Sequence, residues 1–322
     1  MYVLGLGGSN HDFSSCLLHN GKIVCMIEEE RITRKKHGLG LGIEVAKGAS
    51  WKYCLKQAGI GFEQISQVVA NDILLKSLYF RIPVKVSLIN HHLAHAASCF
   101  YPSGFQEAAV MVVDAVGSRF SVDGKLKYET VSLYKADNKG IHPLFKQYGD
   151  NLPGTDYIEN SLGVFYSVMT QVAGFNEMEE GKTMGLAPYG SDKRYQEVKQ
   201  YLRLTGNGCI KMTANDIYAL LEIKNRIDHI EDPKKQFEER ANYAWAAQKV
   251  TEDVMVYFAA YLQKLTGSKR LCLAGGVVLN SVANYKIYKL RLFDQYFIQP
   301  AAGDNGTAIG SAFYGYNNLY KA

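Results

Sequence analysis

The residues best suited to chemistry are the histidines of the run Asn90-His91-His92-Leu93-Ala94-His95. His91 and His95 are four positions apart, so on a helix they share one face with Cβ atoms about 5–6 Å apart. Neutral imidazoles in this arrangement can bind one Zn²⁺ or Fe²⁺ ion, with carboxylates and water completing the coordination. The alternative is a structural role, in which histidines at a helix start cap and pack. The spacing alone does not decide between the two.

Two aspartates are candidates for the remaining ligands. Asp114 follows the apolar run 108–113, which predicts a buried strand, and α/β proteins place functional groups at strand ends. Asp304 lies between Gly303 and Gly306 before a predicted helix, where an aspartate can also be a simple helix cap. Two histidines and two carboxylates would make a partly open site suited to Lewis-acid catalysis.

Two glycine-rich segments have features of nucleotide sites. Gly275-Gly276 joins a predicted strand to a predicted helix, whose free backbone amides favour a phosphate. A glycine pair before a helix is also an ordinary tight turn. The segment Glu180-Gly181-Lys182-Thr183 contains Gly-Lys-Thr but lacks the GxxxxGK spacing of a P-loop, so we reject that assignment.

Further candidates lie near the N-terminus. Asn10-His11-Asp12 follows the first predicted strand and is either a turn or the source of a general base or substrate-binding pair. On charge alone, the basic run Arg31–His37 indicates a solvated loop. We expect only surface roles for His19 and His37.

The chain pattern predicts an α/β fold. Strands are predicted over 2–7, 14–18 and 22–28, with a hairpin turn at Asn20-Gly21, and a similar unit covers 108–113, 118–122 and 127–134 with a turn at Asp123-Gly124. Two such units indicate duplicated lobes, each led by a meander. Further strands are predicted over 84–89, 270–274 and 293–299, and helices over 44–58, 161–173, 237–265, 277–290 and 304–314. We assign no function to the polar stretch between 190 and 235.

Length, charge and composition limit the number of domains and the class of protein. The 322 residues, 47% of them hydrophobic, are enough for two domains. A net charge of +5 is too small to indicate a nucleic-acid partner. The six cysteines contain no CxxC pair, and the sequence shows neither a signal-peptide pattern nor a membrane-length apolar run. We therefore expect a cytoplasmic protein with reduced thiols and no membrane partner.

Taken in order, several motifs resemble the N-terminal domain of the O-carbamoyltransferases of nodulation-factor and antibiotic biosynthesis. That domain is related to the proteins that form threonylcarbamoyladenosine in tRNA. The matching segments are SNHDFSSCLLHNGKIVCMIEEERITRKKH, NHHLAHAASCFYPSGFQEAAVMVVDAVG, ENSLGVFYSVMTQVAGF, EEGKTMGLAPYG, LCLAGGVVLNSVAN and QPAAGDNGTAIG. They follow the family's order from residue 1 to about residue 313, so the resemblance covers nearly the whole chain.

The resemblance implies an actin-like fold, shared with sugar kinases, in which two duplicated ribonuclease-H-like lobes enclose the active site. Residues 1–105 with 302–322 would form the first lobe, and residues 106–301 the second.

The resemblance also implies residue roles. His91, His95, Asp114 and Asp304 would hold a divalent metal that contacts the phosphate of carbamoyladenylate; iron is expected, with Zn²⁺, Mn²⁺ or Mg²⁺ as alternatives. His11 and Lys36 would face the carbamoyl group and the acceptor. The adenylate contacts would come from Glu159, Asn160, Lys182, Gly185, Gly275, Gly276 and Asn280.

We therefore expect a carbamoyltransferase core that moves a carbamoyl group from carbamoyladenylate, an ATP-derived nucleotide, to a hydroxyl or amine of a small-molecule biosynthetic intermediate. Family members usually continue with a C-terminal domain that makes this donor, and this sequence ends at Ala322. A separate donor-making protein is thus expected. Two alternatives stay open: a tRNA threonylcarbamoyl transferase, and a non-catalytic nucleotide-binding subunit of a two-component complex. The sequence identifies neither the acceptor nor the oligomeric state.

Overall fold

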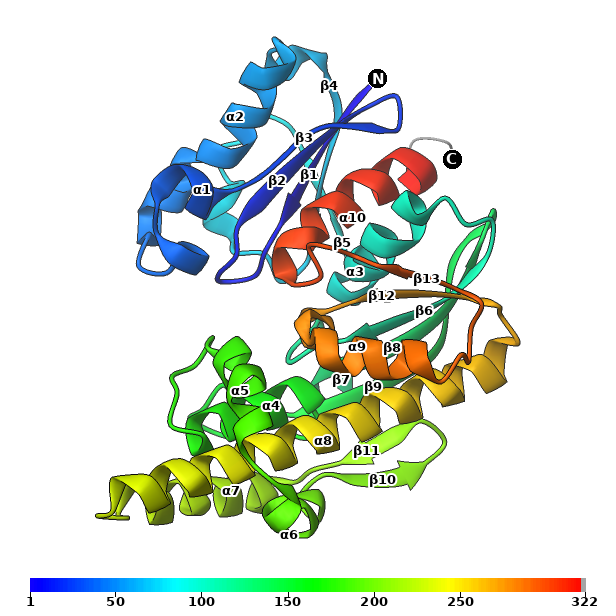
Figure 1. Cartoon of the computed structure of the whole chain (residues 1–322). Coiled ribbons are helices and arrows are strands. Elements are labelled where there is room, and N and C mark those ends of the chain that lie inside the picture. The colour runs from blue at the N-terminus through cyan, green and yellow to red at the C-terminus, as the bar shows by residue number, and fades with distance from the viewer. Residues whose placement is uncertain (320–322) are drawn as a thin grey trace.

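The structure is a computed structural model that describes residues 1–319. It consists of two α/β lobes, one above the other in Figure 1, each built on a mixed sheet. The predicted first-lobe segment 302–322 ends with residues 320–322, which lie outside the described residues. The lobe boundaries at 105/106 and 301/302 stay predictions. Within residues 1–319, no helix has both the length and the apolar character that a membrane crossing requires.

The upper lobe contains a five-stranded sheet of order β3-β2-β1-β4-β5. Its strands are β1 (Tyr2–Gly7), β2 (Ser14–His19), β3 (Lys22–Glu28), β4 (Ile65–Asn71) and β5 (Val86–Ile89). The first three strands form an antiparallel meander, while β4 runs parallel to β1 and β5 parallel to β4. The predicted turn is confirmed: Asn20 and Gly21 have φ values of 49° and 75°, as a two-residue hairpin turn requires.

The lower sheet repeats this topology. Its strands are β6 (Ala108–Val113), β7 (Arg119–Val122), β8 (Lys125–Asp137), β9 (Gly140–Asp150), β12 (Arg270–Ala274) and β13 (Gln295–Ile298). β8 pairs antiparallel with β6 and β9, whereas β12 runs parallel to both β6 and β13. The order β9-β8-β6-β12-β13 therefore matches β3-β2-β1-β4-β5 strand for strand, which confirms the predicted duplication.

The second meander was assigned wrongly in one respect. We expected its strands to be 108–113, 118–122 and 127–134. Instead β6 and β7 pair with successive parts of β8 along one edge, and β9 pairs along the other edge. The third strand of the meander is therefore β9, for which the sequence analysis made no prediction.

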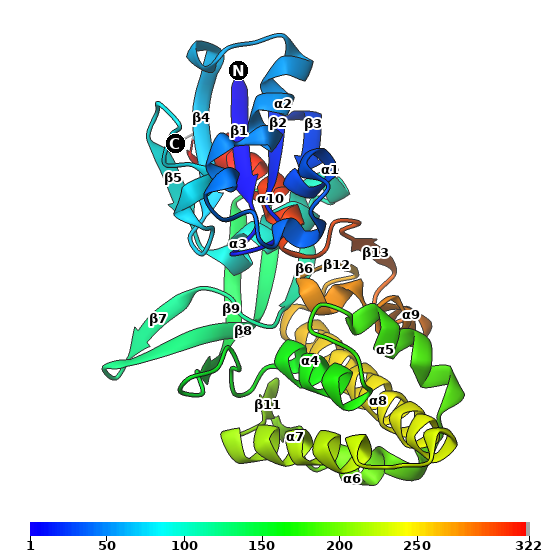
Figure 2. The same cartoon turned by 90° about the vertical axis from the view of Figure 1, so that its left-hand side faces the viewer.

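Helices fill the remaining segments. They are α1 (Glu29–Thr33), α2 (Ala49–Ala58), α3 (His91–Phe100), α4 (Leu162–Val172), α5 (Glu180–Leu186), α6 (Tyr195–Lys199), α7 (Ala214–Asp228), α8 (Pro233–Thr266), α9 (Ser281–Lys289) and α10 (Thr307–Tyr314). Figure 2 shows α4 to α8 gathered in the lower lobe, where they cover the large core around Phe165 and Phe258.

Two predicted helices start later than expected. Gly48 has a left-handed backbone (φ 59°), which separates α2 from the 3-10 turn Gly42–Lys47. The helix predicted from 277 begins at Ser281, because the Asn280 side chain accepts a hydrogen bond from the Ala283 amide and caps it. The polar stretch between 190 and 235 contains α6, α7 and the small hairpin of β10 (Arg203–Gly206) and β11 (Cys209–Lys211).

Helices α3 and α10 occupy equivalent positions, since α3 follows β5 and α10 follows β13 (Figure 1). They cross closely at Gly310, where an added Cβ would lie 1.7 Å from the Ala94 carbonyl oxygen. α10 also packs directly on β1, where a Cβ at Gly5 would lie 2.1 Å from the Ala308 carbonyl oxygen. α10 therefore packs on the upper sheet and α3 on the lower one, so the crossing of the two helices joins the sheets.

Candidate metal centre

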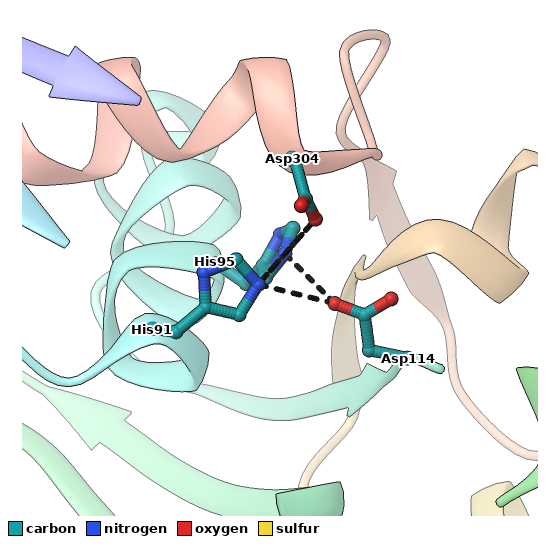
Figure 3. A group of neighbouring side chains, drawn as sticks. All are labelled: His91, His95, Asp114 and Asp304. Carbon is teal, nitrogen blue, oxygen red and sulfur yellow. Dashed lines mark hydrogen bonds and ion pairs between the residues drawn. The ribbon is translucent and has the colours of Figure 1, made fainter. Parts of the chain in front are cut away.

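The four predicted metal ligands converge between the two sheets (Figure 3). His91 and His95 lie on successive turns of α3, and Asp114 directly follows β6. Asp304 opens the 3-10 turn Asp304–Gly306 that leads into α10. The two equivalent helices and one strand end therefore bring together side chains that are far apart in the sequence.

The distances fit a single ion. The Nε2 atoms of His91 and His95 are 3.1 Å apart, and each lies 3.2 Å from Asp114 Oδ2. Asp304 Oδ1 is 3.4 Å from His91 Nε2 and 3.6 Å from His95 Nε2. Ligand atoms about 2.0–2.2 Å from one ion stand roughly 3.0–3.6 Å apart in tetrahedral or octahedral geometry. Two imidazoles and two carboxylates are also a common donor set for divalent metals.

Burial and charge favour a cation here. Both histidines are fully buried, and the two aspartates are less than a tenth exposed. Burial raises the pKa of Asp114, but its hydrogen bonds with His91 and His95 outweigh burial and hold the pKa below its usual value. For His91 the effects have the opposite sign: burial lowers its pKa, but Asp304 and Asp114 raise the pKa overall to about 10. Burial also raises the pKa of Asp304, but His91 and His95 hold it well below its usual value, so the site holds two ionised carboxylates that stabilise positive charge.

Asn71, the last residue of β4, orients His91. Its Oδ1 lies 3.2 Å from His91 Nδ1, and its Nδ2 donates to the carbonyl of Gly8 at 2.8 Å and to Thr307 Oγ1 at 3.0 Å. Histidines that bind metals usually donate their second ring N–H to such an acceptor. His95 differs, since its buried Nδ1 has no hydrogen-bond partner within residues 1–319.

A second group of contacts fixes the start of α3. The His91 amide donates to Ser118 Oγ at 2.8 Å, and the Asn90 side chain accepts from the Leu93 amide. Asn90 also donates to Glu129, a fully buried carboxylate that pairs with Lys146. His92 does not belong to the ligand group: its Nδ1 lies 2.7 Å from Ser132 Oγ, and burial holds its pKa well below the usual value.

The predicted nucleotide turn touches the metal centre. Gly275 has a φ of 104°, and a Cβ there would lie 2.3 Å from the Val113 carbonyl oxygen. The Gly276 amide donates to Asp114 Oδ1 at 3.2 Å. The turn therefore helps to orient a candidate ligand. Asn280 lies just beyond it and exchanges hydrogen bonds with Gln248.

The other predicted nucleotide residues make contacts within the lower lobe. Glu159 accepts from the Ala214 amide at 2.7 Å, where it caps α7, and Asn160 Oδ1 accepts from the Met212 amide at 3.1 Å. Lys182 pairs with Glu179. Gly185 lies on α5 with open space where a side chain would be. None of these contacts reaches the four converging side chains, and nucleotide binding by these residues stays a prediction.

The loop between β1 and β2 links the metal centre to the basic run. The Gly8 amide donates to the Asp304 carbonyl at 3.0 Å, and the Asp12 amide donates to the His37 carbonyl at 2.8 Å. His11 therefore lies on a loop anchored at both ends. Lys36, which was expected to face the carbamoyl group and the acceptor together with His11, is exposed in the 3-10 turn Lys36–Gly38, and that role stays a prediction.

His37, for which we expected a surface role, is only partly exposed and contacts Asp12. Its Nδ1 lies 2.8 Å from Asp12 Oδ1, and its side chain is only 26% exposed. This contact is not recognisable from the sequence, because the two residues are 25 positions apart.

Two solved structures share this architecture over essentially the whole chain. Full-length HypF in its phosphate- and nucleotide-bound form aligns with a TM-score of 0.62 at 15% identity, covering 100% of this chain and 56% of HypF. Component A of the (R)-2-hydroxyglutaryl-CoA dehydratase of Acidaminococcus fermentans aligns with a TM-score of 0.57 at 14% identity, covering 99% of both chains. The fold is thus actin-like, as predicted, with two ribonuclease-H-like lobes around the candidate metal centre.

The chain belongs to the carbamoyltransferase N-terminus family, whose model matches residues 75–313. It is 30% identical to the uncharacterized protein sll1178 of Synechocystis, over 97% of this chain and 56% of that protein. It is 26% identical to the nodulation protein NolNO of Sinorhizobium fredii, over 96% of this chain and 47% of NolNO. The chain therefore spans about half the length of these curated relatives.

Proposed function

We propose that the chain is the transfer core of a metal-dependent carbamoyltransferase. It would move a carbamoyl group from carbamoyladenylate to a hydroxyl or amine of a small-molecule biosynthetic intermediate. The observation that carries this proposal is the buried convergence of His91, His95, Asp114 and Asp304 in a chain of the carbamoyltransferase family.

Those four side chains would hold the metal, for which Fe²⁺ is our first candidate and Zn²⁺, Mn²⁺ or Mg²⁺ the alternatives. When bound, such an ion supplies Lewis-acid stabilisation of negative charge on the donor phosphate. Gly276 holds Asp114 through its amide, and Asn71 holds His91. Gly275 and Gly276 would also offer their turn to the adenylate.

His11 and Lys36 would act on the acceptor. The acceptor oxygen or nitrogen attacks the carbamoyl carbon, the bond from that carbon to the phosphate oxygen breaks, and AMP leaves. His11 takes the proton that the acceptor loses, and Lys36 orients the acceptor. The buried position of the site between the lobes limits the access of water, which would otherwise hydrolyse the donor.

Carbamoyladenylate synthesis is a different reaction from carbamoyl transfer and needs its own site. We assign it to a separate protein. All six cysteines are free thiols, which supports a reducing compartment such as the cytoplasm.

The test is an incubation of metal-reconstituted protein with synthetic carbamoyladenylate, following AMP release with and without candidate acceptors. His95→Ala should lose the metal and lower AMP release by at least about 100-fold, because the site loses a direct ligand. His142→Ala is the matched control, since His142 is 53% exposed and lies in β9.

Three results would count against the proposal. Unchanged metal content and turnover in His95→Ala would remove the metal assignment. A product that forms only with tRNA would favour a tRNA-modifying enzyme. Tight nucleotide binding without AMP release, even with a donor-making partner present, would favour a non-catalytic subunit.

A further inference from the structure

Asp12 has one imidazole against each of its carboxylate oxygens. His11 Nδ1 lies 3.0 Å from Asp12 Oδ2, and His37 Nδ1 lies 2.8 Å from Asp12 Oδ1. All three side chains are about a quarter exposed, so solvent only partly screens the contacts. The three side chains thus form a continuous series of contacts from His37 through the Asp12 carboxylate to His11.

The backbone is held in an unusual conformation to make these contacts. Asp12 and His37 have φ values of 53° and 57°, a left-handed region that costs residues with a side chain about 1–2 kcal/mol. Two hydrogen bonds retain it: the Asp12 amide donates to the His37 carbonyl at 2.8 Å, and the His37 amide donates to Glu30 Oε2 at 2.7 Å. Strain retained in this way is typical of functional sites.

His11 is linked to the metal centre as well as to Asp12. Its loop is bonded to Asp304 through the Gly8 amide. Burial lowers the pKa of His11, but the hydrogen bond to Asp12 and the charges of Asp304, Asp12 and Asp114 raise it overall. His11 uses Nδ1 for Asp12, and within residues 1–319 its Nε2 makes no hydrogen bond. That nitrogen is therefore available to a substrate.

We propose that Asp12 and His37 are positioning residues that prepare His11 for proton transfer. The inference rests on the proposed function, in which His11 is the base. Asp12 accepts the Nδ1–H of His11 and so fixes the tautomer whose Nε2 is free. His37 donates its Nδ1–H to the other oxygen and keeps the carboxylate in place. The proton of the acceptor O–H or N–H moves to His11 Nε2, and the carboxylate stabilises the imidazolium until the product leaves.

The sign of the pH dependence follows from the charges around the two histidines. His11 faces Asp12 of its own loop, Asp304 before α10 and Asp114 after β6; His37 faces Asp12 and Glu30 of α1. The three carboxylates around His11 favour its imidazolium form. Asp12→Asn removes the nearest charge, so the pKa of His11 should fall and the acidic limb of kcat/KM should move to lower pH. The plateau should fall by at least about tenfold, because the amide no longer enforces the tautomer.

Two substitutions of His37 distinguish a positioning role from a purely structural one. His37→Leu removes the donor to Asp12, whereas His37→Asn keeps a donor nitrogen close to the place of Nδ1 and tolerates the left-handed backbone. We expect His37→Leu to lower kcat by at least about fivefold and His37→Asn to stay within about twofold of wild type. KM for carbamoyladenylate and the metal content should not change in either variant.

A second measurement does not depend on turnover. Proton–nitrogen NMR of the imidazoles, with His11 assigned from His11→Ala, reports its tautomer and its pKa. Wild type should show a proton on Nδ1 of His11, and Asp12→Asn should show a lower pKa. If Asp12→Asn and His37→Leu both keep the wild-type tautomer, pKa and pH profile, the positioning role is overturned even where His11→Ala is inactive.

Two other results would have a different meaning from loss of the positioning role. Wild-type turnover in His11→Ala would overturn the base assigned in the proposed function. The ligand atoms of Asp12, Glu30 and His37 also lie within 4.8 Å of one another. A second equivalent of bound metal that disappears in His37→Leu would therefore identify a second metal site and overturn the positioning role of Asp12 and His37.

Discussion

The two lobes have the same five strands in the same order and directions, yet they differ in what joins the third strand to the fourth. In the upper lobe this connection, residues 29–64, holds only α1, short 3-10 turns and α2. In the lower lobe it spans residues 151–269 and holds α4 to α8 (Figure 2). The lower lobe accordingly has a core of many more side chains than the upper lobe.

Equivalent positions also carry different residues, and the candidate metal centre depends on this difference. The first strand of the upper sheet ends at Gly7 and is followed by Gly8, whereas the first strand of the lower sheet is followed by Asp114. The helix after the last strand of the repeated unit starts at His91 in one copy, and three residues after Asp304 in the other. Duplication thus supplies matched positions around one point, and divergence provides nitrogen ligands from one copy and oxygen ligands from the other.

The largest loss of stability is expected where the two equivalent helices cross. Gly310→Ala would place a Cβ 1.7 Å from the Ala94 carbonyl, so α3 and α10 must move apart. We expect a loss of about 3 kcal/mol in the free energy of unfolding, the upper end for overpacking, and weaker metal binding because both helices position ligands. Urea denaturation with and without a chelator measures both effects.

Gly181→Ala is the matched control. It is also a helix glycine, but nothing lies within 4 Å of its added Cβ. The substitution should stabilise the protein by about 0.5–1 kcal/mol through helix propensity. Equal effects at the two positions would show that the crossing is not tightly packed.

A smaller effect is expected from removing the support of only one histidine. Asn71→Ala leaves His91 Nδ1 without its acceptor, while His95 has no such partner among the described residues to lose. We expect metal affinity to fall by about 10–100-fold, as is usual for residues that orient a ligand.

Competition with a chromophoric chelator measures this affinity, and Asn138→Ala in the exposed turn between β8 and β9 is the control. Affinities that are the same in Asn71→Ala and Asn138→Ala would mean that the two histidines are equivalent after all.

The smallest effect concerns two buried carboxylates. Glu129 in the lower lobe pairs with Lys146, whereas Glu29 in the upper lobe accepts from the Ser50 amide and hydroxyl, both at 3.0 Å, and no ion pair with residues 1–319 is present. Burial raises the pKa of Glu29, although the hydrogen bonds from Ser50 oppose this. The folded state therefore retains a proton that the unfolded state has lost, so the contribution of Glu29 to stability falls as pH rises through its folded pKa.

Glu29→Gln keeps the acceptor and removes this dependence. Relative to wild type it should gain stability as the pH rises above about 4.5, by less than about 1 kcal/mol. Unfolding free energies across the range of roughly pH 4.5–8 check this. Parallel curves for the two proteins would show that Glu29 titrates alike in the folded and unfolded states.

Local sequence signals predicted both hairpin turns and most strands, but β4 and β9 to β11 were not predicted, because tertiary context decides where such segments pair. β9 was missed because Pro143 interrupts its pattern, yet it lies at the sheet edge, where a proline is tolerated. A continuous helix was predicted across Gly48 because its apolar spacing continues through the break. α7 had a readable signal: Thr213 and Asp216 form a capping box ahead of buried residues at helical spacing.

The candidate site was also predictable from the sequence only in part. Each of the four converging side chains lies in a motif at a strand end or helix start, so residue type and position made them candidates, and the family resemblance then selected them as one ligand set. Asn71 also ends a strand, but an amide next to a histidine is not recognisable as its partner from sequence. The pairing of Asp12 with His37 depends on two left-handed residues, which sequence patterns do not indicate for aspartate and histidine.

The packing of α10 on β1 has a consequence for synthesis on the ribosome. One hydrophobic cluster joins Val3, Cys16 and Leu18 to Ala308, Ala312 and Phe313. The N-terminal sheet therefore keeps an uncovered apolar face until residues 307–314 emerge, a delay of roughly 15–60 s at about 5–20 residues per second. Throughout that interval the nascent chain exposes a surface of the kind that chaperones recognise, and α10 covers it only at the end of synthesis.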